Sequence, residues 1–135
     1  MASFVNELSS RNPWKLEKER FLELKHFCLQ YESWRVKVFE MTYLPVINRM
    51  EVKGTEKKNI VEEKAMLLAN LQHNLNIVRE CVEQADPDLR DYILVGVTQN
   101  KSYEWLVTNM NMPASSFMYY DRYRKFFWLL DKVRN

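Results

Sequence analysis

Apolar side chains recur along the first part of the chain with the spacing of an α-helix. Six of them advance in alternating steps of three and four residues: Leu24, Phe27, Tyr31, Trp34, Val38 and Met41. This is the a/d pattern of a heptad repeat, whereas a strand would alternate with a period of two. Asn12 is a good N-cap, Pro13 suits a first helical position, and Pro45 cannot continue a helix. We therefore predict one helix over residues 13–44.

A second apolar stripe follows a connection predicted at residues 45–54. Its members are Val61, Leu68, Leu71, Leu75, Val78, Val82 and Ala85. Gly and Pro are absent from residues 55–85, so we predict a second helix there. Each helix would be roughly 45 Å long at a rise of ~1.5 Å per residue. Equal lengths, matching stripes and a short connection predict an antiparallel hairpin, which would bury its apolar faces against the rest of the chain, a second subunit, or both.

A third helix is expected after residue 85. Asp86 would be its N-cap and Pro87 its first residue, while Gly96 and Asn100 are expected to end it. The apolar run 92–97 also has the propensity of a strand, but the chain offers no partner strand, so we favour a helix.

Two more helical segments complete the chain and are separated by a short turn at 111–113. Ser102 would cap the first, whose apolar residues follow helical spacing: Tyr103, Leu106, Val107 and Met110. The second would run from about residue 114 to 133. Its expected inner face consists of Phe117, Tyr120, Tyr123, Phe127 and Leu130. A short helix, a turn with buried Met112 and a longer helix together match the helix-turn-helix pattern.

The composition agrees with a helical protein. The chain has 135 residues, of which 47% are hydrophobic, and this suffices for one domain with a core. Only two Gly and four Pro are present, which disfavours turn-rich sandwiches and barrels. We predict an all-α fold with a long N-terminal antiparallel hairpin at residues 1–85, used for oligomerisation or partner contact. Residues 86–135 would form a C-terminal helix-turn-helix that binds DNA.

The charge is unevenly distributed, although the net charge is only +2. Residues 114–135 contain five basic and two acidic side chains, whereas residues 86–113 contain two basic and four acidic ones. The last predicted helix is therefore the one concentrated basic element. Such a helix is compatible with two interpretations: a solvated amphipathic surface, or a recognition helix with basic groups for phosphates.

The recognition-helix interpretation names specific residues. Short or polar side chains at the helix start would meet base edges, and basic side chains elsewhere would meet phosphates. The candidates for base proximity are Ser115, Ser116, Met118 and Tyr119. The candidates for phosphate contact are Lys101, Arg122 and Lys125.

The segment from Met112 to Leu130 resembles the C-terminal signature of the RinA/ArpU-type phage transcriptional regulators. The matching residues are Ser116, Tyr119, Tyr120, Tyr123, Arg124, Lys125, Phe126 and Phe127. The chain departs from that group at Pro113, where a capping Ser is usual. The resemblance covers about residues 103–134. It implies a sigma-factor-like helix-turn-helix in a phage or prophage activator of late operons, acting on double-stranded promoter DNA with the host RNA polymerase.

Other chemistry has little support in the sequence. The two cysteines, Cys28 and Cys81, lie far apart and outside any C-x-x-C pair, so we expect reduced packing thiols and no metal site. His26 and His73 are isolated, and no phosphate loop or nucleophile motif is present. We expect no enzymatic activity and no cofactor. With no secretory signal or membrane-spanning stretch expected, the predicted location is the host bacterial cytoplasm.

Two other functions remain open from the sequence. A small-terminase-like packaging protein would also join helical hairpins to a helix-turn-helix, but it would assemble as a ring. A helical interaction protein that inhibits a host factor would use the hairpin and bind no DNA. A regulator would be a monomer or a homodimer, and a symmetric dimer would bind half-sites about one helical turn apart.

Overall fold

The computed structural model describes residues 12–44 and 54–135, and all regular structure in these ranges is helical. The predicted all-α class is therefore confirmed. The elements in chain order are α1 (Lys18–Leu29), α2 (Tyr31–Tyr43), α3 (Gly54–Ala85), the 3₁₀ helix η2 (Pro87–Leu89), α4 (Arg90–Gln99), α5 (Tyr103–Met110) and α6 (Ser116–Val133). The predicted connection at 45–54 lies outside the described residues except for Gly54, the first residue of α3.

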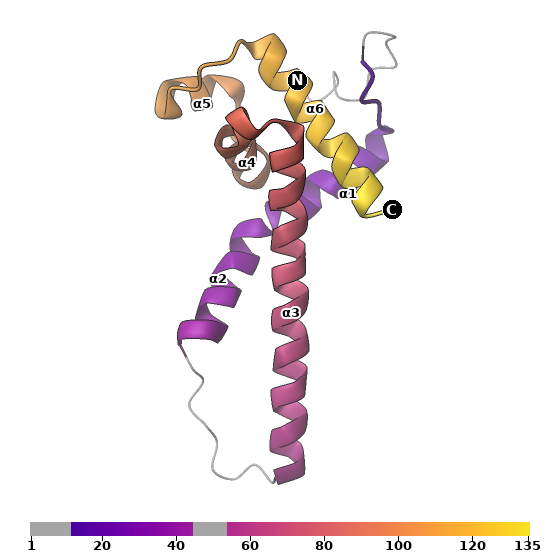
Figure 1. Ribbon diagram of the computed structural model, residues 1–135, viewed down its shortest axis with the longest axis vertical. Coiled ribbons are helices and arrows are strands. Elements are labelled where there is room, and N and C mark those ends of the chain that lie inside the picture. Colours follow the sequence, from indigo (N-terminus) through magenta and orange to yellow (C-terminus); the bar gives the residue numbers. More distant parts are fainter. Residues whose placement is uncertain (1–11, 45–53) are drawn as a thin grey trace.

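The helices gather around one end of α3, the longest element (Figure 1). α1, α4 and α6 pack near the C-terminal end of α3, and α5 lies at the outer edge of this group. α2 runs beside the middle of α3 and diverges from it toward the far end. The first half of α3 therefore extends beyond the packed part of the molecule.

The prediction of a single helix over 13–44 is wrong in two respects. The helix begins at Lys18, because the Asn12 side chain accepts a hydrogen bond from the Trp14 amide and closes a local turn instead (3.0 Å). It is also interrupted at Gln30, whose φ and ψ are −87° and −6°. α1 packs on α4 and α6, whereas α2 packs on α3. A straight rod would not reach both sets of partners, and the break redirects the chain.

The apolar stripe predicted for this segment is nevertheless the buried one. Leu24, Phe27, Tyr31 and Trp34 are buried, and Val38 and Met41 pack partly buried against the core. The stripe continues across Gln30 because the break changes the helix axis without exchanging the inner and outer faces.

The expectation of two equally long helices is also wrong. α3 has 32 residues as predicted to within one position, but α2 has only 13. Burial along the α3 stripe begins at Leu71 and continues through Leu75, Val78, Val82 and Ala85. Val61, which was predicted to belong to this seam, is 61% exposed.

The core joins the N-terminal helices to the C-terminal ones. Its fully buried side chains include Phe21 and Leu24 of α1, Val78 of α3, Ile93 of α4, and Phe126, Phe127 and Leu130 of α6. The rings of Phe21 and Phe127 meet edge to face with centroids 5.1 Å apart. Burying each large apolar side chain contributes about 1.5–3 kcal/mol, so contacts between α1 and α6 are a main source of stability.

Three of the four positions predicted to begin or end the segment after α3 do so. The Asp86 carboxylate accepts from the Asp88 amide, and Pro87 opens the 3₁₀ turn that leads into α4. Asn100 ends α4 in the left-handed region with φ 56°. Gly96, however, does not end the helix. It lies inside α4 and is buried, and a Cβ at this position would overlap the hydroxyl of Tyr119.

Candidate nucleic-acid interface

The short connection between α4 and α5 is set by local hydrogen bonds. Asn100 turns the chain in the left-handed conformation, which Asn tolerates better than most residues. Ser102 then caps α5 as predicted, because its side-chain oxygen accepts from the Trp105 amide at 3.1 Å. Between them, the Lys101 ammonium lies 4.7 Å from the centre of the Trp105 ring. Lys101 is therefore fixed at the start of α5 and remains partly exposed.

The turn between α5 and α6 is held from several sides. Asn111 ends α5 with φ 53°, and Met112 is buried as predicted. The Tyr103 hydroxyl donates to the Ala114 carbonyl at 2.8 Å and ties the turn to α5. Ser115 caps α6, since its side-chain oxygen accepts from the Met118 amide at 3.2 Å. The start of α6 is thus set in place by local contacts.

The four residues predicted to face base edges divide into two groups. Ser115, Ser116 and Met118 are exposed at the first turn of α6. Tyr119 is only 1% exposed and lies in the core, so its assignment to the outer face is wrong. The space above Gly96 admits the Tyr119 ring, and this long-range fit decides which side of α6 turns inward.

The predicted position of Phe117 is also wrong. The helical pattern assigns it to the inner face, but 81% of its surface is exposed. Phe127 and Leu130 are buried as predicted, and Tyr120 and Tyr123 pack partly buried against the core. Tyr119 and Phe126 complete the inner face. α6 has aromatic residues on nearly every side, so periodicity supports more than one inner face. The signal that could have located Phe117 is its place beside the serines of the first turn.

The three predicted phosphate contacts have different surroundings. The Arg122 guanidinium pairs with the Asp86 carboxylate at 3.1 Å and also with its neighbour Asp121. The Lys125 ammonium lies 5.7 Å from the centre of the Trp14 ring. Arg122 is therefore engaged by two carboxylates within the protein, and a phosphate would have to compete with both.

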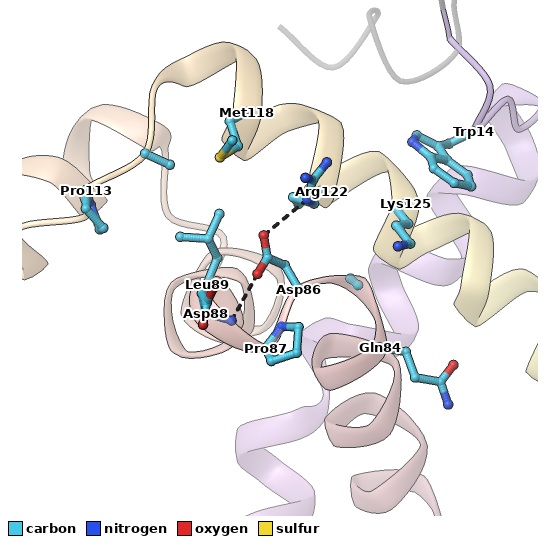
Figure 2. Close-up of a pocket in the computed structure, with 12 residues that line it drawn as sticks. Trp14, Gln84, Asp86, Pro87, Asp88, Leu89, Pro113, Met118, Arg122 and Lys125 are labelled. Atoms are coloured by element: carbon cyan, nitrogen blue, oxygen red, sulfur yellow. Dashed lines mark hydrogen bonds and ion pairs between the residues drawn. The ribbon is translucent and has the colours of Figure 1, made fainter.

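These side chains border a cleft of about 650 Å³ between α6 and the η2 turn (Figure 2). Arg122 points from α6 across the cleft toward Asp86, and Asp86 is itself fixed by the Asp88 amide. Trp14 closes one end of the cleft, where its indole N–H donates to Asp121 at 3.3 Å. The cleft thus has ionic contacts across it and is a packing junction rather than an open basic surface.

The N-terminal segment covers the middle of α6. The rings of Trp14 and Trp128 meet edge to face with centroids 5.1 Å apart. Further along, the Arg20 side chain pairs with Asp131, and the Arg134 guanidinium lies 3.6 Å from the centre of the Phe27 ring. The middle and end of α6 are therefore anchored to the protein, and its first turn is the exposed part.

A cluster of tyrosines lies beneath the exposed turn. The rings of Tyr103, Tyr119, Tyr120 and Tyr123 contact one another with centroids about 5–6 Å apart. Burial raises the pKa of Tyr119 and of Tyr123, so both phenols are neutral at physiological pH. The Tyr119 hydroxyl has no hydrogen-bond partner among the described residues. The cluster supports the corner by packing and supplies no charge.

Comparison with protein-family models, curated proteins and solved structures finds no match to this chain. Within the described ranges, no group of three or more His, Cys, Asp and Glu side chains is placed to hold a metal ion. No helix in the described part of the chain combines the length and apolar character needed to cross a membrane. Cys28 and Cys81 are free thiols buried in the core, which agrees with the packing role predicted for them.

Proposed function

We propose that this protein is a DNA-binding transcriptional regulator that presents the first turn of α6 to the major groove. The observation that carries the proposal is the anchored, open start of this helix. Ser115 caps it, Ser116 and Phe117 face solvent, and the rest of the helix is held by the core. A recognition helix needs this combination of a rigid base and exposed side chains at its N-terminal end.

The exposed side chains suit contact with bases. The Ser116 hydroxyl can donate and accept a hydrogen bond, and Phe117 and Met118 offer apolar contact to thymine methyl groups. The positive end of the α6 dipole and the partly exposed Lys101 ammonium favour an approaching phosphate. In this proposal, Arg122 and Lys125 orient α6 through Asp86 and Trp14 and are not the main phosphate contacts.

The regulatory context of the proposal comes from the resemblance to the RinA/ArpU-type group. The aromatic and basic string on α6 is the shared feature. It implies a phage or prophage activator of late operons that works on promoter DNA together with the host RNA polymerase. The helical start at Ser116, directly after a capping serine, supports placing Ser116 and the following residues at the DNA.

Fluorescence anisotropy with labelled duplexes tests the proposal. The probes are fragments upstream of genes adjacent to this gene, compared with a shuffled duplex of equal length and base composition. We expect tighter binding to one of the upstream fragments and a steep loss of affinity between low and moderate salt, because phosphate contacts release counterions. Equal affinity for every duplex at all salt concentrations would contradict the proposal.

Matched variants assign the contact surface. Phe117→Ala is expected to weaken specific binding about 5- to 50-fold, in the range of a lost base contact, while Val133→Ala, at the opposite end of α6, leaves it unchanged. Both side chains are exposed, so neither change should affect folding. Lys101→Gln is expected to make the fall of affinity with salt less steep, by the amount that about one phosphate contact contributes. Lys58→Gln, on the distant part of α3, is expected to leave the salt dependence unchanged. If the two variants of each pair changed DNA binding equally, the DNA would bind at another surface.

A further inference from the structure

The first half of α3 extends beyond the other described helices (Figure 1). α2 has 13 residues and α3 has 32, so α2 covers roughly 20 Å of a helix about 48 Å long at ~1.5 Å per residue. Among the described side chains between Lys58 and Asn70, only Leu68 is partly buried, and the others are exposed. This half of α3 is therefore left largely uncovered by residues 12–44 and 71–135.

The exposed half continues the apolar stripe that the other half buries. Ile60 and Leu67 lie seven residues apart on the same side of α3 as Leu71 and Val78. Leu71 and Val78 are buried, whereas Ile60 is 40% and Leu67 is 48% exposed. An apolar stripe that runs past its intramolecular partners is characteristic of a helix that pairs with another one.

α2 contributes apolar side chains to the same end of the molecule. Phe39 and Tyr43 are exposed, and their ring centroids lie 5.1 Å apart. Together with Val38 and Leu75 they border one part of a groove of about 530 Å³ between α2 and α3, and the polar side chains of Arg35, Gln72, Asn76 and Arg79 border the rest. This end of the molecule thus presents an apolar ridge on α3 and a groove whose lining is half apolar and half polar.

The charges around this surface favour a partner with the same surface. The described part of α3 from Lys58 to Asn70 carries two lysines and two glutamates, and α2 carries two acidic and two basic residues. Both sets are neutral overall, so an identical copy meets no net repulsion, and neither a strongly acidic nor a strongly basic partner is selected. An identical chain also brings an apolar stripe with the same spacing.

We propose that the hairpin tip, defined as residues 36–44 of the α2 end and 58–68 of α3, is a self-association surface for a second copy of this chain. Two hairpins pack around a twofold axis and form a four-helix bundle. The ridge around Ile60 and Leu67 of each copy fills the groove beside Phe39 and Tyr43 of the other. The proposal does not depend on DNA binding, and its test uses no DNA.

Sedimentation velocity of the full chain over a range of concentrations gives the first test. The wild-type protein is expected at twice the mass of one chain. The double variant Ile60→Glu/Leu67→Glu is expected to be monomeric, with a dissociation constant raised at least about tenfold, since each glutamate would bury a charge in the interface. Met66→Glu is the matched control, because Met66 is 68% exposed and points about 100° away from Leu67 around α3. It should remain dimeric.

Cross-linking gives a second test that does not depend on a charged variant. Cys28 and Cys81 are the only cysteines of the chain and both are buried, so an added cysteine is the accessible thiol. Leu67→Cys is expected to form a covalent dimer with a flexible bismaleimide. Met66→Cys is expected to form much less covalent dimer with the same reagent.

Three results would overturn the proposal. The first is a wild-type chain that stays monomeric at concentrations of about 100 μM, where even a weak dimer of micromolar affinity would form. The second is a dimer that is equally stable in the double variant and in Met66→Glu, and in which Leu67→Cys and Met66→Cys cross-link equally. Its interface would then lie elsewhere. The third is a ring of eight or more copies, which would exclude the twofold bundle and support a packaging protein.

Discussion

Gly96 shows how one residue links two helices. It lies inside α4, where glycine normally weakens a helix, and the space of its missing side chain is occupied by the Tyr119 hydroxyl. Gly96 therefore stabilises a contact between α4 and α6 rather than its own helix. The local sequence pattern predicts a helix end at Gly96, because it contains no sign of a tyrosine 23 positions later.

Gly96→Ala is expected to lower the free energy of unfolding by about 1–3 kcal/mol, because the added methyl overlaps the Tyr119 hydroxyl and forces the helices apart. Urea denaturation followed by circular dichroism measures the change. Tyr119→Phe removes the opposing hydroxyl, which has no partner, and should itself be neutral or stabilising. In that background, Gly96→Ala should cost much less. An equal cost in both backgrounds would show that the hydroxyl is not the obstacle.

The buried thiols predict a loss of stability at alkaline pH. Burial raises the pKa of both Cys28 and Cys81, that of Cys81 to about 11. The unfolded chain ionises its thiols near pH ~8.5, so above that pH the native state binds more protons than the unfolded state. The free energy of unfolding then falls as pH rises, by about 1.4 kcal/mol per pH unit for each buried thiol.

Urea denaturation between pH 7 and about 10 measures this effect. Stability should be nearly flat up to pH ~8 and decline above it. Cys81→Ala is expected to decline less steeply than the wild type, although it starts from a lower stability because of the cavity. Parallel curves for the two proteins would contradict a contribution from Cys81.

At the scale of the helix, the sequence predicts those caps that depend on neighbouring residues. Ser102, Asp86 and Asn100 act as predicted, since each bonds or turns within a few positions. The start of α1 at Lys18 was not predicted, and neither was the break of the first long segment at Gln30. Neither Gly nor Pro marks the break, and it follows from the different partners of α1 and α2.

The two adjacent serines at the start of α6 offer a matched comparison. Ser115→Ala is expected to cost about 1 kcal/mol of unfolding free energy, because it removes the hydrogen bond to the Met118 amide. Ser116→Ala should cost little, since Ser116 is exposed and alanine is a better helix former. Thermal unfolding of both variants checks this. A larger loss for Ser116→Ala would place the cap one residue later.

At the scale of the whole molecule, the packing of α3 is graded along its length. Its C-terminal half lies against α6, α4 and α2, while its first half is largely exposed. Helices in water derive most of their stability from tertiary packing. The two halves of one continuous helix should therefore differ in their opening free energy.

Hydrogen exchange measures that difference. At low protein concentration, amides of residues 58–68 are expected to exchange at least about tenfold faster than those of residues 71–85. Raising the concentration should slow exchange in 58–68 if the hairpin tips associate, and should leave 71–85 unchanged. Uniform slow exchange along α3 at low concentration would contradict the graded packing.

The sequence by itself determined the helical class, most helix ends and most of the stripe that faces the core. These features depend on the spacing of apolar residues and on caps that act within one turn. Only the tertiary structure decided that Tyr119 faces inward and Phe117 outward, and that Arg122 is paired with Asp86. α6 has aromatic residues on nearly every side, so several faces satisfy the helical period. The space above Gly96 and the contacts of Trp14 select one of them, because close packing between distant segments admits a single fit.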